Sequence, residues 1–145
     1  MWDFQLEMEN RRVLGIDPGE ARVGVAVSDD LCMLAHPLET IDVSKLDPCD
    51  RIAELAAEKA ACALIVGVPR NMDGSFGPAA EKARALIEKL RRRVKCKVIP
   101  WDERLTTVSA QRALREAGRK AKNQRSVIDQ AAAQILLQSW IDSQT

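Results

Sequence analysis

Three acidic residues occupy positions where a carboxylate could bind a metal ion or take part in a reaction, and not only contact solvent. Asp17 ends a short apolar run, Arg12–Ile16, and a proline–glycine pair follows it at once. Glu103 lies just beyond a later apolar run, and Asp129 lies near the start of a predicted helix. Carboxylates gathered at one end of a sheet would offer the oxygen ligands that Mg²⁺ or Mn²⁺ prefers. Such a site supports metal-assisted hydrolysis of phosphate esters.

Asp17 and Glu103 also have ordinary structural explanations. An aspartate before Pro-Gly is typical of a turn that its own side chain closes, and for Asp17 alone this explanation is about as good as the chemical one. Glu103 belongs to an Asp-Glu-Arg stretch that suits a surface turn leading into a helix. Because Asp102 and Glu103 are adjacent, they point in different directions, and only one of them should face a site.

Asp129 has two interpretations as well. It stands three residues after Ser126, which is the spacing of a capping box. At about 100° per residue it aligns with Ala133, Leu136 and Trp140, so it heads the apolar face of the helix rather than the polar one. A carboxylate in that position caps the helix, binds a cation, or does some of both.

Electrostatics separates these explanations when the acids are considered together. Two carboxylates about 4 Å apart repel by on the order of 4 kcal/mol at an effective dielectric constant of about 20. A cluster of three is therefore tolerated only where protons or cations neutralise it. Asp17, Glu103 and Asp129 are candidate metal ligands, provided that the fold brings them together.

The elements that must position these acids follow from periodicity and turn residues. Three strands with short connections predict an antiparallel meander, and alternating helices and strands after it predict a mixed sheet with helices on both faces. Asp47 can cap a helix whose first residue is Pro48. The expected strands cover 13–17, 23–29, roughly 33–41, 63–68 and 97–101, and the expected helices begin at Pro48 and Pro78 and cover about 107–117 and 126–142. The fold class is α/β.

Length and composition set the outer limits. The 145 residues, 46% hydrophobic and 30% charged, fit one folded domain at 13–145 behind an N-terminal extension at 1–12. No apolar stretch approaches the roughly 18 residues that span a membrane, and the extension has no apolar signal core, so we expect a cytoplasmic protein. A monomer or a weak homodimer is expected. The net charge of +1 does not by itself indicate a nucleic-acid partner.

Local clustering of basic residues does indicate such a partner. A solvated face is the ordinary explanation of a charge run. The basic residues from Arg112 to Arg125, however, lie between the segments of Glu103 and Asp129, where a phosphate backbone would pass. With 3% aromatic residues and no tyrosine, recognition should use the backbone rather than base stacking. The candidate nucleic-acid ligands are Arg104, Arg112, Arg115, Arg119, Lys120, Lys122 and Arg125, and the candidate site-bordering residues are Gly19, Asn71, Asp73 and Gly74.

Four ordered motifs resemble those of the YqgF family, ribonuclease-H-like proteins regarded as pre-16S ribosomal RNA nucleases and relatives of Holliday-junction resolvases. They are LGIDPG at 14–19 with VGVA at 23–26, IVGVP at 65–69 with NMDG at 71–74, DERLTT at 102–107, and IDQAAA at 128–133. The family more often has Phe or Tyr where this chain has Pro18. The resemblance implies a ribonuclease-H-like fold with a five-stranded sheet, three strands of it antiparallel. It also implies that Asp17, Glu103 and Asp129 converge as catalytic, metal-binding acids.

The leading functional hypothesis is a metal-dependent nuclease that processes the 5′ end of pre-16S ribosomal RNA, with Mg²⁺ or Mn²⁺ as cofactor and the RNA precursor favoured over branched DNA. Cleavage of branched DNA is the alternative within the same chemistry. A non-catalytic RNA-binding factor in ribosome assembly is an alternative of another class. Phosphoryl transfer of the actin-like type ranks low, since it needs two such domains and the chain has one.

Overall fold

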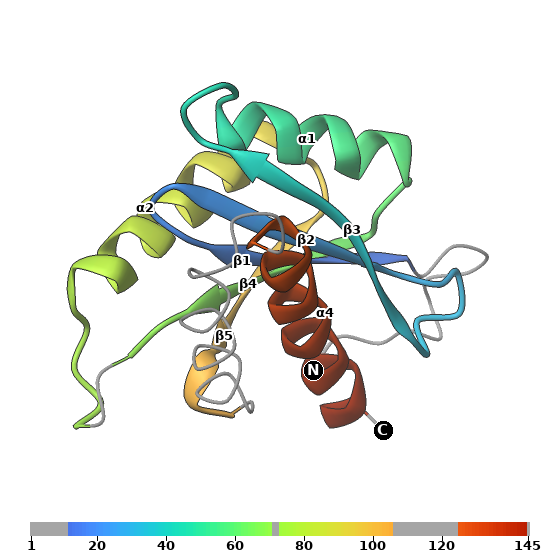
Figure 1. The fold of residues 1–145 in the computed structure, drawn as a ribbon. Coiled ribbons are helices and arrows are strands. Elements are labelled where there is room, and N and C mark those ends of the chain that lie inside the picture. Colours follow the sequence, from blue (N-terminus) through green and yellow to red (C-terminus); the bar gives the residue numbers. More distant parts are fainter. Residues whose placement is uncertain (1–11, 71–72, 106–124, 145) are drawn as a thin grey trace.

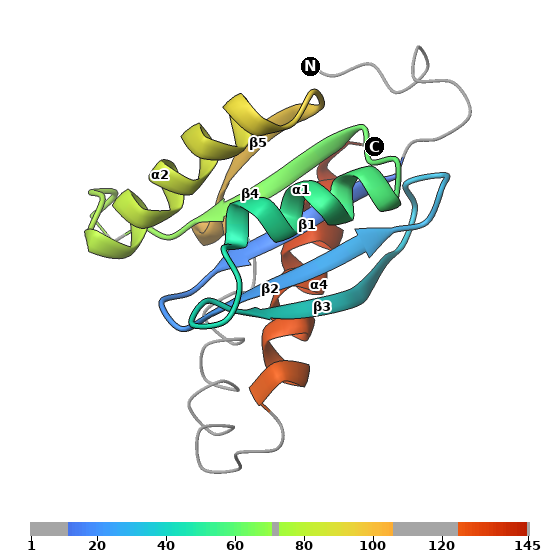
Figure 2. The same cartoon turned by 90° about the horizontal axis from the view of Figure 1, so that it is seen from above.

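The computed structural model describes residues 12–70, 73–105 and 125–144, which form one five-stranded sheet with helices on both faces (Figures 1 and 2). The elements are β1 (Val13–Pro18), β2 (Arg22–Ser28), β3 (Ala35–Asp42), α1 (Pro48–Glu58), β4 (Ala63–Val68), α2 (Pro78–Arg93), β5 (Lys97–Asp102), a 3₁₀ turn (Glu103–Leu105) and α4 (Arg125–Ser143). The strand order is β3-β2-β1-β4-β5. Within the described ranges, none of the helices combines the length and apolarity that crossing a membrane requires.

The pairing of the strands confirms the predicted mixed sheet. β1, β2 and β3 are antiparallel neighbours, whereas β4 is parallel to β1 and β5 is parallel to β4. β3 begins at Ala35, later than the predicted start near 33, because Asp29 closes a turn there by accepting hydrogen bonds from the backbone N–H groups of Met33 and Leu34. The expected helix at 107–117 and residues 1–11 of the extension lie outside the described residues.

The two faces of the sheet bury different side chains. Large apolar residues such as Leu14, Ile16 and Leu64 pack under α1 and α2. The opposite face packs on α4 and carries smaller residues, including Ala26 and Ala63, beneath the buried Leu and Trp side chains of that helix. Since successive strand residues point to opposite faces, Asp17 faces α4 together with Val13 and Gly15.

Glycines let α4 approach the sheet closely. A Cβ atom added to Gly15 would lie 2.6 Å from Cβ of Leu137, and one added to Gly24 would lie 2.1 Å from the backbone oxygen of Asp129. Both separations are shorter than atoms tolerate, so each position requires a residue without a side chain. The glycines on β1 and β2 therefore fix where α4 sits and where its first turns meet the sheet.

An ion pair between α1 and the edge strand β3 leads to a first prediction. Arg51 donates two hydrogen bonds to Glu39, at 2.8 and 2.7 Å, and these bonds hold the pKa of Glu39 below its usual value. We expect Glu39→Gln to lower the free energy of unfolding by about 1 kcal/mol at neutral pH. Because the pKa of Glu39 is lower in the folded than in the unfolded protein, its carboxylate stabilises the fold at pH values above the unfolded-state pKa. The difference in unfolding free energy between wild type and variant should therefore vanish as pH falls through the folded-state pKa of Glu39.

Urea denaturation at neutral pH and near pH 3 measures this effect. Glu88→Gln is the matched control, because Glu88 pairs with Arg91 at 3.1 Å while both side chains are about half exposed or more. An equal loss in the two variants, or a loss in Glu39→Gln that persists at low pH, would contradict the prediction.

Candidate active site

Asp17 lies near the carboxyl end of β1 and is buried, with 4% of its surface exposed. Its Cα partner on β2 is Gly24. On the other side, Ile16 pairs with Val66, a register that places Gly67 of β4 next to Asp17. Asp17 therefore lies in the middle of the sheet between two glycines, on the face that α4 covers. A carboxylate in such a place is costly to bury unless hydrogen bonds or positive charge compensate it.

Glu103 reaches the same place from β5. It begins the 3₁₀ turn that follows the strand, and it is 5% exposed. A Cβ atom added to Gly67 would lie 3.0 Å from Oε1 of Glu103, so the carboxylate lies over Gly67. The glycine thus leaves the room that this carboxylate occupies beside Asp17.

Asp129 approaches from the helix side. Its backbone oxygen lies over Gly24, the residue opposite Asp17 on β2. Its carboxylate forms an ion pair with Arg22, with Nε and Oδ2 3.3 Å apart, and the Asp129 side chain is 18% exposed. α4 begins at Arg125, one residue before the predicted start.

The three acids therefore lie at one corner of the molecule, which we call the acid corner: Asp17, Glu103 and Asp129. Oxygen donors of this kind suit a hard divalent cation. In the described part of the chain, however, no group of three or more His, Cys, Asp and Glu side chains lies close enough together to hold a metal ion. The structure brings the acids to a common corner and leaves the Asp129 carboxylate paired with a guanidinium rather than joined to the other two.

Arg22 is a residue of this site that the sequence argument missed. Like Gly24, it lies on the face of β2 toward α4, and its side chain is 28% exposed. The signal was present as a basic residue two positions before Gly24, which is the separation of strand residues that share a face. Its guanidinium supplies positive charge to a corner that holds three carboxylates.

Asp102 has a different role from its neighbour Glu103, as their adjacency predicted. Asp102 binds two guanidiniums: Nη2 of Arg104 is 2.8 Å and Nη1 of Arg70 is 3.3 Å from Oδ2. The hydrogen bond from Arg104 and the other contacts hold the pKa of Asp102 below its usual value. Of the predicted nucleic-acid ligands, Arg104 thus lies beside the acid corner, directly after Glu103.

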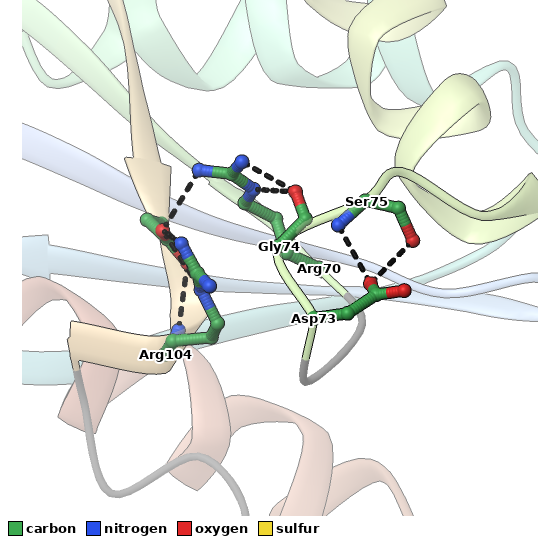
Figure 3. Close-up of polar contacts among 6 residues, drawn as sticks. Arg70, Asp73, Gly74, Ser75 and Arg104 are labelled. Carbon is green, nitrogen blue, oxygen red and sulfur yellow. Dashed lines mark hydrogen bonds and ion pairs between the residues drawn. The ribbon is translucent and has the colours of Figure 1, made fainter.

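The loop before α2 is closed by its own polar groups (Figure 3). Asp73 accepts hydrogen bonds from the backbone N–H of Ser75, at 2.9 Å, and from its hydroxyl group, at 2.6 Å, and these bonds lower the pKa of Asp73. Gly74 has a φ of 88°, which favours glycine, and its carbonyl oxygen accepts a hydrogen bond from Nε of Arg70 at 3.0 Å. A Cβ atom on Gly74 would lie 3.4 Å from Nη1 of Arg104, so this loop borders the turn that carries Glu103.

The remaining predicted site residues have different outcomes. Gly19 forms the tight, exposed turn between β1 and β2, where an added Cβ atom would lie 2.4 Å from the carbonyl oxygen of Arg22. Arg125 is the first residue of α4, at the end of the helix that carries Asp129. The predictions for Asn71, Arg112, Arg115, Arg119, Lys120 and Lys122 lie outside the described residues.

Comparison with known proteins gives the family. A family model described as "RuvX: Holliday junction resolvase" matches residues 11–143, nearly the whole chain. The chain belongs to this family. A RuvX/YqgF relative from Acetivibrio thermocellus, provisionally named a pre-16S rRNA nuclease, is 47% identical over 137 residues, which cover 91% of this chain and 96% of the relative. A relative from Mycobacterium tuberculosis with the same name is 52% identical over 133 residues, 90% of this chain and 78% of the relative.

A solved structure confirms the fold of this RuvX-family chain. Thermus thermophilus RuvC in complex with a Holliday junction substrate superimposes with a TM-score of 0.53 at 17% identity, covering 92% of this chain and 95% of that one. The fold is ribonuclease-H-like, as the motifs implied.

Proposed function

We propose that residues 13–145 form a single metal-dependent nuclease domain that hydrolyses phosphodiester bonds. The observation that carries this proposal is the buried Asp17, flanked on its two neighbouring strands by glycines over which Asp129 and Glu103 lie. Arg22 offsets part of the negative charge at this corner, and a divalent cation bound by the carboxylates would offset more. Membership of a family described as resolvases, with relatives named as nucleases, supports the same chemistry.

Asp17, Glu103 and Asp129 would hold Mg²⁺ or Mn²⁺, with Asp129 giving up Arg22 to do so. A divalent ion in such a site supplies an activated water molecule and stabilises the oxygen that leaves. The protein supplies the ligands: Asp17 on a strand, Glu103 on a short turn, and Asp129 on the helix that covers them. Arg22, once Asp129 leaves it, is placed to attract a substrate phosphate.

The favoured substrate is the 5′ region of pre-16S ribosomal RNA, because the named relatives are more similar to this chain than RuvC is. We propose that the protein works in the cytoplasm, as a monomer or a weak homodimer. Branched DNA is the second candidate, since the family description and the RuvC complex both concern Holliday junctions. A non-catalytic RNA-binding role is disfavoured, because all three acids are present in the chain.

The test is a cleavage assay with the purified full chain on a ribosomal RNA precursor fragment and on a four-way DNA junction, each with Mg²⁺, with Mn²⁺ and with EDTA. We expect cleavage of the RNA that EDTA abolishes. Cleavage of the junction alone would assign the second candidate instead. Retention of RNA binding without cleavage of either polymer, with any divalent ion, would support the non-catalytic role and overturn the nuclease proposal.

Metal binding gives an independent prediction. Glu103→Gln and Asp129→Asn should each weaken Mn²⁺ binding, measured by electron paramagnetic resonance of the free ion, by at least about tenfold, since even residues that only orient ligands change affinity that much. Asp73→Asn is the control, because Asp73 is committed to the Ser75 turn. Equal Mn²⁺ affinities in all four proteins, wild type included, would exclude these acids as ligands.

A further inference from the structure

Two arginines lie against one exposed aromatic ring beside the acid corner, and a third is joined to one of them through a shared carboxylate. The guanidinium carbons of Arg70 and Arg84 each lie 4.6 Å from the centroid of the Phe76 ring, and Arg104 is joined to Arg70 through Asp102. They come from three elements: the loop after β4, helix α2 and the turn after β5. We call this group, Arg70, Arg84 and Arg104 with Phe76, the arginine surface.

The guanidiniums of Arg70 and Arg104 are held in place before any ligand binds. Arg70 donates to the Gly74 carbonyl oxygen through both Nε and Nη2 and to Asp102 through Nη1 (Figure 3). Its guanidinium also lies against the Phe76 ring. Arg104 donates to Asp102 through Nε and Nη2. A planar guanidinium fixed in this way loses less conformational entropy on binding an anion than a mobile lysine does.

Hydrogen-bond donors remain available on this surface. Asp102 is a single carboxylate shared between two guanidiniums, and in the described part of the chain Nη1 of Arg104 has no acceptor, with 40% of the side chain exposed. Among the described residues, the acid that pairs with Arg84 is Glu81, at 3.5 Å and with both side chains more than half exposed, an arrangement that contributes little. Guanidinium groups with spare N–H donors match the oxygens of a phosphate.

The aromatic ring does not offer an open stacking platform. Phe76 is 44% exposed, but two guanidiniums already lie within cation–π distance of it. The ring therefore serves to position the arginines rather than to receive a base. This arrangement suits contacts with the sugar–phosphate backbone, which carry no sequence information.

We propose that the arginine surface binds the phosphate backbone next to the bond cleaved at the acid corner, and that Asp102 is the positioning residue that holds Arg70 and Arg104 for this purpose. The placement supports it, since Arg104 directly follows Glu103 and the Gly74 loop contacts Arg104. This inference rests on the proposed nuclease function, and it extends the binding site to α2 and to the loop before it. None of Arg70, Phe76 and Arg84 was among the predicted nucleic-acid ligands.

Binding without cleavage tests the proposal. Fluorescence anisotropy in EDTA measures the affinity of the full chain for a labelled ribosomal RNA fragment and for a labelled DNA junction over a range of salt concentrations. Arg84→Gln and Arg104→Gln should each weaken binding several-fold at low salt. Each should also reduce the slope of log Kd against log salt by about 0.7 to 0.9, the value for one lost phosphate contact.

Arg91→Gln is the matched control. Arg91 lies on the same helix as Arg84, pairs with the acid three residues before it and has a similar exposure, 48% against 54%, but it lies two turns further along α2. The affinity of the Arg91→Gln variant for each polymer, and its salt slope, should equal those of the wild type. If Arg84→Gln and Arg104→Gln match Arg91→Gln on both polymers, the proposal is overturned; a reduced slope on either polymer supports it and shows which one the surface serves.

Asp102→Asn separates positioning from simple charge. Removing a negative charge from the surface should tighten binding to a polyanion if charge alone matters. If Asp102 positions Arg70 and Arg104, the variant should instead bind more weakly while its thermal stability stays close to that of the wild type. Tighter binding would overturn the role of Asp102. This assay contains no metal and measures no cleavage, so unchanged binding in the variants would contradict the arginine surface without testing the acid corner. If instead the protein proved not to be a nuclease, reduced salt slopes in the variants would still show that these arginines contact phosphates.

Discussion

Asp17→Asn should abolish cleavage while leaving the fold intact. Asparagine has nearly the same shape as aspartate, so the packing of a residue that is only 4% exposed should survive the change. The substitution removes the negative charge of Asp17, the central one of the three acids at the acid corner. Loss of a metal ligand that stabilises developing charge costs several kcal/mol, which corresponds to a rate decrease of about a thousandfold.

Single-turnover cleavage measured beside thermal unfolding distinguishes lost chemistry from lost structure. Without divalent ion the variant should unfold at the same temperature as the wild type or slightly higher, because one of three neighbouring negative charges is gone. Mn²⁺ should raise the unfolding temperature of the wild type and have little effect on the variant, since a ligand stabilises only the protein that binds it.

Asp73→Asn serves as the matched control here too. Asp73 lies in the loop that borders the turn of Glu103, but its carboxylate accepts hydrogen bonds from Ser75 within its own turn. This variant should cleave at close to the wild-type rate. Full activity of Asp17→Asn, or an equal loss in both variants, would rule out the central role given to Asp17.

Local patterns predicted most of what positions the site. Asp47 caps α1 by accepting a hydrogen bond from the Asp50 N–H at 3.0 Å, and Pro48 is the first residue of the helix, both as expected. The continuous apolar strand at 63–68 is buried along its whole length. These features depend on neighbours a few residues apart, so turn chemistry and periodicity are enough to predict them.

The charge partners at the site could not be predicted in the same way. Arg22 and Asp129 are far apart in the sequence and meet only because α4 crosses β2 at Gly24. The pairing of Asp102 with Arg70 depends likewise on the parallel registry of β4 and β5. A sequence pattern shows that a carboxylate faces inward, but which guanidinium it meets is decided by tertiary packing.

Gly24→Ala should be the most damaging small substitution on this face of the sheet. The new methyl group would lie 2.1 Å from the backbone oxygen of Asp129 and 2.7 Å from its carbonyl carbon. Backbone of a packed helix cannot rotate away as a side chain can, so α4 must shift. Overpacking of this kind costs about 1 to 3 kcal/mol, more than the roughly 0.5 to 1 kcal/mol that alanine gains over glycine within a strand.

Gly67→Ala is the informative comparison, because it adds the same methyl group to the same face. There the nearest atom is Cδ1 of Leu136, at 2.3 Å, which is the flexible end of a side chain, and the next is Oε1 of Glu103, at 3.0 Å. Urea denaturation should therefore show the larger loss of stability in Gly24→Ala. Cleavage should fall in both, since one variant displaces Asp129 and the other displaces Glu103. If both variants cleaved at the wild-type rate, the positions of these acids over the glycines would not matter, and the acid corner would be architecture rather than a catalytic site.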